Sequence, residues 1–349
     1  METAATRPLV DVDALRAFLT NHFGEERELR VERIIAGKSN ETFFVDWGDQ
    51  RWVLRRPPAG PLPPSAHDMM REYRVLTGLH GQGARAPHTV LGCADESVMG
   101  VPFYLMEYVP GVVLLERQPD FIARPEERRR VGEQMVRALA EVHAVDWRAA
   151  GLEGFGKPQG FVKRQVDRRM VQLESIMVRC RHLPEMVEVH DWLSEHLPPE
   201  SAESTIVHGD YGLHNVIFKA QAPATAAAIV DWELSSLGDP LTDLGWLTAM
   251  WQEPDDPGDS HDPFSLTSQP GFHSREELVE LYQEITGREV HDMPFYRILS
   301  IWRLAIALEG SYARFKLGVT DNPYFETLEQ RVPSMARRCL AIASGERKA

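Results

Sequence analysis

The chain lacks the features of a membrane protein or of a disulfide-stabilised secreted protein. No apolar run reaches the roughly 18 residues that a membrane-spanning helix needs, and the first eight residues do not resemble a signal peptide. Only three cysteines occur, Cys93, Cys180 and Cys339, and they are isolated from one another, which predicts neither a disulfide framework nor a zinc site. We therefore expect a cytoplasmic protein with no membrane partner.

Positive charge is also scarce. The 349 residues include 38 Lys and Arg against 52 Asp and Glu, and the net charge of -14 argues against general nucleic-acid binding. No G-x-S-x-G sequence occurs, which argues against a serine hydrolase of that type. We find no internal repeat or low-complexity segment. The length of the chain favours two lobes rather than one hydrophobic core.

What the sequence does contain is a pair of polar motifs bracketed by short apolar runs. Residues 207–215 read VHGDYGLHN, and residues 229–233 read IVDWE. An Asp, an Asn five residues later and a second Asp beyond the next apolar run have the spacing of the catalytic loop and the magnesium-binding motif of kinases. The apolar runs at 205–207, 215–218 and 228–230 predict strands around these two loops.

This pattern predicts a phosphoryl-transfer site. We expect Asp210 to be the catalytic base that accepts the proton of an incoming hydroxyl. Magnesium prefers oxygen ligands and keeps several waters, so the amide oxygen of Asn215 and the carboxylate of Asp231 would suffice as its protein ligands. We expect His208 to brace the loop through a hydrogen bond, and we assign no role to His214. A single Asp of this kind could be a cap or a surface carboxylate, so the prediction depends on the combination.

A helix start is predicted just downstream. Asp239 lies where an N-cap would lie, and Pro240 takes the first helical position. Asp243, in the first turn, could hold the catalytic loop through backbone N–H groups. We interpret Asp239 and Asp243 as structural rather than catalytic residues.

A kinase-like site also needs a turn over the nucleotide phosphates. Two apolar, β-rich runs on either side of residues 36–41 predict a hairpin, whose turn could approach phosphates through Gly37, Ser39 and Asn40. The turn is not a Walker A loop, because that motif needs a glycine where Glu32 stands.

A cation and its acidic partner are predicted next. In the strand at 52–56, Val53 and Arg55 share one face, as the Ala and Lys of the kinase V-A-I-K motif do. Arg55 would therefore grip phosphate oxygens, which Arg can do in bidentate fashion. Residues 65–79 predict an amphipathic helix, and we assign its Glu72 as the partner of Arg55. The alternatives are a solvated Arg55 and a surface Glu72.

The last required part is a hinge that binds adenine. Residues 102–111 read as a buried strand that runs into a Pro-Gly break. We assign the backbone of Glu107 and Val109 to the adenine edge, although an ordinary strand followed by a turn would look the same.

With these residues the chain resembles the aminoglycoside phosphotransferase-like kinases over nearly its whole length. Within them it is most similar to the branch that is fused in animals to an acyl-CoA dehydrogenase. The segments that carry the closer resemblance are VLRRPP at 53–58, MEYVPG at 106–111, the catalytic segment, and matches within 269–278, 282–288 and 295–305.

The resemblance implies an α+β, bilobal, protein-kinase-like fold. Its N-terminal lobe, residues 1–109, would hold an antiparallel sheet with a helix and bind nucleotide, and its mostly helical C-terminal lobe, residues 110–349, would carry catalysis and substrate binding. The resemblance also implies ATP and magnesium as cofactors and a hydroxyl of a hydroxyacyl-CoA as acceptor. Any acyl-CoA dehydrogenase partner would act in the same pathway as a separate polypeptide.

Two other functions stay open, an aminoglycoside or other antibiotic kinase and a nucleotide-binding pseudokinase scaffold. The presence of Asp210, Asn215 and Asp231 together argues against the scaffold. The acidic loop at 253–262 would suit a polycationic antibiotic, but we interpret it as a mobile surface loop or lid.

The second half of the chain is predicted to be helical. Apolar periodicity predicts helices at 125–145, 161–178, 275–286, 295–315 and 322–342. The helix at 295–315 is apolar enough to be buried, so its Arg303 and Glu309 should meet partners. Arginines at 128–130, 164, 168 and 169 could form a local basic face or be solvated helix positions.

Overall fold

The computed structural model describes residues 9–34, 40–58, 68–115, 118–201, 203–256 and 265–346. Its helices, strands and 3-10 turns are α1 (Val12–Phe23), β1 (Leu29–Ile34), β2 (Glu41–Trp47), β3 (Gln50–Arg56), α2 (Met69–Leu79), β4 (Thr89–Cys93), α3 (Glu96–Met99), β5 (Phe103–Glu107), β6 (Val112–Val113), η1 (Asp120–Ile122), α4 (Pro125–His143), α5 (Phe161–Met177), α6 (Pro184–Glu195), β7 (Thr205–Val207), η2 (Leu213–Asn215), β8 (Val216–Phe218), β9 (Ala226–Ile229), η3 (Trp232–Leu234), β10 (Ser236–Gly238), α7 (Leu241–Met250), η4 (Ser265–Ser268), α8 (Arg275–Thr286), α9 (Met293–Lys316), η5 (Pro323–Thr327) and α10 (Leu328–Ala343).

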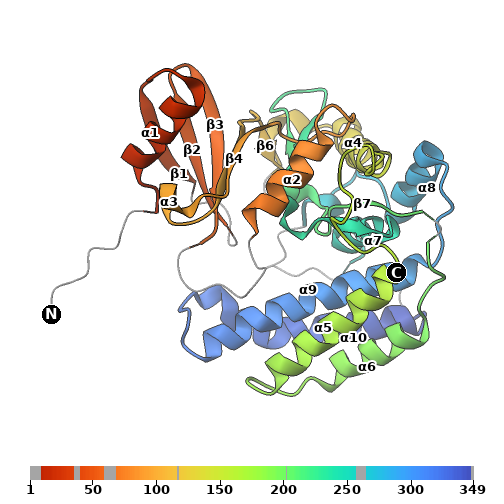
Figure 1. The fold of residues 1–349 in the computed structure, drawn as a ribbon. Coiled ribbons are helices and arrows are strands. Elements are labelled where there is room, and N and C mark those ends of the chain that lie inside the picture. Colours follow the sequence, from red (N-terminus) through yellow and green to blue (C-terminus); the bar gives the residue numbers. More distant parts are fainter. Residues whose placement is uncertain are drawn as a thin grey trace.

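The N-terminal part is a five-stranded antiparallel sheet in the order β1-β2-β3-β5-β4 (Figure 1). Alternation along β3 gives its two faces different partners. Leu54 and the apolar residues on its face form a small core with α1, whereas Val53 joins the larger core together with residues of α2. Arg55 shares the face of Val53, so β3 directs it toward α2, the helix that carries Glu72.

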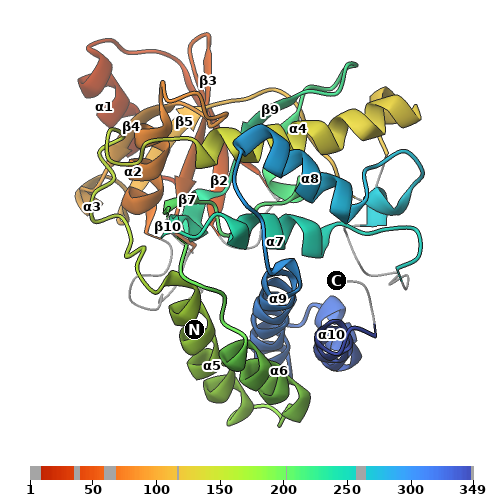
Figure 2. The same ribbon diagram turned by 90° about the vertical axis from the view of Figure 1, so that its right-hand side faces the viewer.

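The rest of the described chain is mostly helical. A three-stranded sheet, β6-β8-β9, and the pair β10-β7 carry the loops of the catalytic motif. Helices α5, α6, α9 and α10 pack together below them, as both views show (Figures 1 and 2). The predicted α+β class, with an antiparallel sheet first and helices after it, is confirmed. The division at residue 109 stays a prediction.

Most predicted elements lie within a few residues of their predicted ends. The predicted helix at 322–342 is instead a 3-10 turn followed by α10, which contains Pro333. Helix α7 starts at Leu241, one residue later than predicted, and its N-cap is Pro240 rather than Asp239. The carboxylate of Asp239 still accepts the N–H of Leu241, at 2.9 Å.

Helices α1 and α6 were not predicted, although both carry start signals. The side chain of Asp11 caps α1 by accepting the N–H of Ala14 at 3.0 Å, and Gly24 ends the helix in the left-handed conformation. Pro184 opens α6 at its first turn.

Charged residues inside α9 have partners, as predicted. The fully buried carboxylate of Glu309 accepts two hydrogen bonds from Arg181, at 2.7 and 2.9 Å. None of the three cysteines, all within the described residues, forms a disulfide. Among the described helices none is long and apolar enough to span a bilayer.

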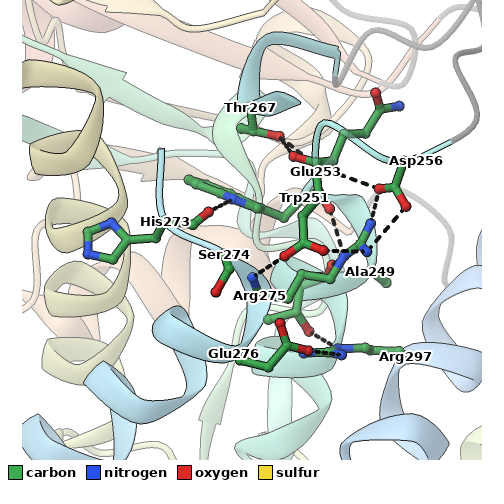
Figure 3. Close-up of polar contacts among 12 residues, drawn as sticks. Ala249, Trp251, Glu253, Asp256, Thr267, His273, Ser274, Arg275, Glu276 and Arg297 are labelled. Carbon is green, nitrogen blue, oxygen red and sulfur yellow. Dashed lines mark hydrogen bonds and ion pairs between the residues drawn. The ribbon is translucent and has the colours of Figure 1, made fainter. Parts of the chain in front are cut away.

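The described start of the predicted surface loop, residues 253–256, has Pro254 and Asp255 exposed, but its Glu253 and Asp256 are partly buried against Arg275. Figure 3 shows Arg275, only 2% exposed, surrounded by this segment. Its guanidinium pairs with Glu253 at 3.3 Å and with Asp256, and it donates to the carbonyl of Trp251 at 2.9 Å. Glu253 and Asp256 therefore neutralise a buried cation, whereas Asp255 between them is exposed. Residues 257–262 lie outside the described residues.

Replacing Arg275 by Met should lower the free energy of unfolding by about 3–5 kcal/mol, because Glu253 and Asp256 lose the cation that compensates them. Arg129, which pairs with Glu277 on the surface at 3.0 Å, provides the control, and Arg129→Met should cost less than about 1 kcal/mol. Denaturant unfolding of both variants measures the difference. Equal losses would contradict a structural role for the Arg275 cluster.

Candidate active site

A buried carboxylate fixes the loop that carries Asp210. Asp243, on α7, accepts the backbone N–H groups of His208 and Gly209, at 2.6 and 2.8 Å. Its Oδ2 also lies 3.3 Å from Nε2 of His143, whose Nδ1 lies 2.7 Å from the hydroxyl of Tyr282. Burial acts to raise the pKa of Asp243, but these hydrogen bonds and the nearby histidines hold it below its usual value. Asp243 therefore makes the backbone hydrogen bonds that its predicted structural role requires.

His208 braces the loop from within. Its Nδ1 accepts the backbone N–H of Asp210 at 3.3 Å, so the ring proton resides on Nε2, which donates to the carbonyl of Val230 at 3.0 Å. The two hydrogen bonds connect the loop after β7 to the end of β9. The ring is completely buried, which agrees with a structural rather than a proton-carrying histidine.

Asp210 is partly exposed and surrounded by donors. Nε2 of His214 lies 3.2 Å from Oδ1 of Asp210, and the amide of Asn215 donates to its Oδ2 at 3.1 Å. Burial acts to raise the pKa of Asp210, but the interactions with His214 and the hydrogen bond from Asn215 outweigh it and lower that pKa. Asp210 is therefore ionised near neutral pH and can accept a proton.

Asn215 and Asp231 are neighbours across a pair of strands. Val216 pairs with Ile229, and the carbonyl of Asn215 accepts the N–H of Val230 at 2.9 Å. The side-chain nitrogen of Asn215 is directed to Asp210, which leaves its amide oxygen as a possible cation ligand. Asp231 has a left-handed backbone with φ of 67°, which only Gly, Asn and Asp adopt readily.

The oxygen donors of Asn215 and Asp231 fit magnesium, which takes few protein ligands and completes its shell with water and phosphate. Oδ1 of Asp231 is 2.9 Å from Arg55, and its side chain is 33% exposed, so the carboxylate can reach a cation in solvent. The described residues contain no cluster of three or more His, Cys, Asp and Glu side chains that could hold a metal ion by themselves.

Arg55 connects the sheet to these loops. Its Nη1 lies 2.9 Å from Glu72 on α2, and its Nη2 lies 2.9 Å from Asp231, which is 176 residues away in the chain. Glu72 also accepts the backbone N–H of Trp232 at 3.0 Å. The pair that the sequence suggested is thus present, and it includes a third member, Asp231.

Burial and charge act in opposite directions in this cluster. Burial and the charges of Asp231 and Glu233 outweigh the opposing effect of Arg55 and together raise the pKa of Glu72 to about 7. For Arg55, burial disfavours the charge, but Glu72 and the other nearby groups outweigh burial and raise its pKa. Arg55 is therefore a permanent cation in a site that is otherwise rich in carboxylates.

The other predicted nucleotide-binding residues are less well defined. Gly37 and Ser39 lie outside the described residues. The side chain of Asn40 donates to Glu233 at 2.8 Å, so it joins the turn to the D-W-E motif. Glu107 ends β5, and its backbone N–H donates to the carbonyl of His88 at 2.8 Å. Val109 follows β5 and is half-buried, and its role stays a prediction.

Sequence reasoning missed two members of the loop environment. His214, four residues after Asp210, contacts its carboxylate. The spacing is visible in the sequence, but it predicts a contact only if the chain turns at η2. Arg303, on α9, donates to the carbonyl of Gly209 at 3.0 Å. Its burial was expected, but no pattern in the sequence connected it to the catalytic loop.

Residues 30–277 match the model of the phosphotransferase enzyme family. The chain is 34% identical over 316 residues to acyl-CoA dehydrogenase family member 11 of Homo sapiens; the match covers 88% of this chain but only 40% of that protein. A crystal structure of an aminoglycoside phosphotransferase-like protein from Ralstonia eutropha is 32% identical, with a TM-score of 0.80 over 96% of this chain and 98% of that one. The GDP complex of aminoglycoside 2'-phosphotransferase-IIIa is 16% identical, with a TM-score of 0.60 over 94% and 99% of the two chains, and supports the kinase-like fold alone.

Replacing Asp243 by Asn should release the catalytic loop, because the amide NH₂ group cannot accept the backbone N–H that it would face. We expect a loss of about 1–3 kcal/mol in the free energy of unfolding and faster hydrogen exchange of the Gly209 amide. Asp11→Asn is the control, since Asn caps an exposed helix about as well as Asp does. Unchanged exchange at Gly209 would contradict the clamp.

Proposed function

The chain belongs to the phosphotransferase enzyme family, and on that premise we propose that it is an ATP- and magnesium-dependent kinase that phosphorylates a hydroxyl group of a hydroxyacyl-CoA. The observation that carries the proposal is the pair of contacts made by Arg55, at 2.9 Å to Glu72 and at 2.9 Å to Asp231. They bring Arg55, the cation that would bind phosphate, from the sheet next to one of the candidate metal ligands. Residues 1–109 would then form the nucleotide-binding lobe and residues 110–349 the catalytic and substrate lobe.

Asp210 would receive the proton of the acceptor. Its two oxygens are held in place by His214 and Asn215, and its lowered pKa keeps it ionised. A hydroxyl that donates a hydrogen bond to this carboxylate is oriented for attack on a phosphorus atom, and positioning of this kind supplies much of the rate enhancement in phosphoryl transfer.

The phosphate side would be held by Arg55 and by the turn that contains Gly37, Ser39 and Asn40, with Glu107 and Val109 at the adenine edge. Magnesium, when bound to Asn215 and Asp231, would neutralise charge on the phosphates. Glu72 keeps Arg55 in place while Asp231 shares it. The outcome is a cation that stays charged at any physiological pH, next to the position of the transferred group.

The identity of the acceptor is supported by the relatives. The match to acyl-CoA dehydrogenase family member 11 spans about 40% of that protein's length, and we propose that a separate acyl-CoA dehydrogenase acts in the same cytoplasmic pathway. An aminoglycoside or other antibiotic acceptor is the second candidate, because the chain is also 32% identical to the aminoglycoside phosphotransferase-like protein of Ralstonia eutropha. A pseudokinase scaffold would have no need of Asp210, Asn215 and Asp231 together.

An acceptor panel tests the function. The purified chain with ATP and magnesium should phosphorylate hydroxyacyl-CoAs but not kanamycin-type aminoglycosides, and chelation of magnesium should stop turnover. Release of ADP, together with the product mass, measures the reaction. If the chain phosphorylates only aminoglycosides, the acceptor is an aminoglycoside and not a hydroxyacyl-CoA. Nucleotide binding with no turnover across the panel would favour the scaffold.

Asp210→Asn should keep ATP binding and lower turnover at least about a hundredfold, the lower end of the effect of losing a general base. Asn preserves the size of the side chain, so the effect reports the lost negative charge. Asp191→Asn, on the exposed face of α6, is the control and should leave turnover unchanged. Turnover of Asp210→Asn close to that of the wild-type protein would place the base elsewhere.

A further inference from the structure

A cavity of about 290 Å³ lies beside the catalytic loop. Its walls come in part from α5 and α9, which lie below β7 and β10 in Figure 2. Gly209, in the loop after β7, and Leu234, at the end of the η3 turn, also line it. Gly209 lines the cavity and directly precedes Asp210, so the cavity borders the loop that carries the proposed base. The cavity is therefore in a position to hold part of an acceptor.

The wall of the cavity is basic and contains no carboxylate. It includes the side chains of Arg168, Arg169 and Arg303, and no Asp or Glu. Among the described residues none of these arginines forms an ion pair. Nη1 of Arg169 donates only to the amide oxygen of Gln172, at 2.6 Å.

Arg303 is the most constrained of the three. It is 7% exposed, its guanidinium lies 5.1 Å from the ring centre of Trp246, and its Nε is buried without a hydrogen-bond partner. Its Nη2 donates to the carbonyl of Gly209 at 3.0 Å. A buried guanidinium with an unsatisfied donor costs free energy unless an anion joins it.

The electrostatic balance at Arg303 is unfavourable to its charge. Burial and the nearby charge of Arg169 lower the pKa of Arg303 to about 10, against weaker support from Asp243 and Asp210. Both carboxylates act through space, and both already accept hydrogen bonds from other groups. At neutral pH Arg303 is still a cation, so it and Arg169 repel each other, and the cavity lining contains no carboxylate to offset them.

We propose that this cavity is an anion subsite, in which Arg168, Arg169 and Arg303 bind a phosphate or carboxylate group of the acceptor. The inference rests on the proposed kinase function and extends it, because it states the charge that the acceptor must carry. A polycationic aminoglycoside would meet three arginines here and be repelled. Arginine groups favour phosphate and carboxylate because their planar donors match these oxygens.

Direct binding of small anions to the full chain tests the subsite. Inorganic phosphate and malonate are titrated calorimetrically, with the nucleotide site filled by magnesium and a non-hydrolysable ATP analogue. We expect at least one probe to bind, and Arg169→Gln to weaken it at least about tenfold, because a charge-assisted hydrogen bond is lost. The tighter probe identifies the group as a phosphate or a carboxylate.

Arg179→Gln is the matched control. Arg179 follows the same helix, α5, is exposed and does not line the cavity, so its loss should change probe affinity less than about twofold. Arg303 is not used, because its replacement would also release the carbonyl of Gly209. Equal affinity of wild type and Arg169→Gln, or no binding of either probe to wild type, would overturn the proposal.

Kinetics of the same variants separate the two proposals. Arg169→Gln should raise the KM for the acceptor at least about tenfold and leave the KM for ATP unchanged. If anion binding depends on Arg169 but no acceptor is phosphorylated, the subsite is supported and the kinase function is not. If an acceptor is phosphorylated but its KM is the same for wild type and Arg169→Gln, the kinase function is supported and the subsite is not.

Discussion

The structure depends on one buried cation that belongs to two parts of the chain. Arg55 leaves the sheet on β3 and binds Glu72 of α2 and Asp231 of the D-W-E loop. Because its guanidinium is almost fully buried, it needs both carboxylates, and each of them is thereby fixed relative to the sheet. The backbone N–H of Trp232 adds a direct bond between α2 and the same loop.

Residues with a regular local pattern were predictable from sequence. The alternation along β3 placed Arg55 on the face toward α2, and helical periodicity placed Glu72 on that helix, so their contact followed from two local rules. The clamp by Asp243 followed from its position in the first turn of a helix that begins soon after the motif. In each case local geometry determined where the side chain points.

Residues whose partners depend on the tertiary fold were not predictable. Glu253 and Asp256 belong to a segment rich in proline and acid that has the composition of a surface loop, yet the start of α8 brings Arg275 into its centre. Arg303 meets Gly209 only because α9 crosses beneath the catalytic loop. Nothing in the spacing of these residues reports such a crossing, since the segments are far apart in the chain.

The left-handed backbone of Asp231 determines which substitutions at this position report the loss of the carboxylate alone. A residue with a branched β-carbon at this position would meet steric strain of about 1–2 kcal/mol before any effect on ligand binding is counted. Gly and Asn tolerate the same φ of 67°, so they report the missing carboxylate by itself. In homologues, a glycine or asparagine here would therefore mark a protein that has kept the loop and lost the charge, whereas a valine or isoleucine would mark a loop that has been rebuilt.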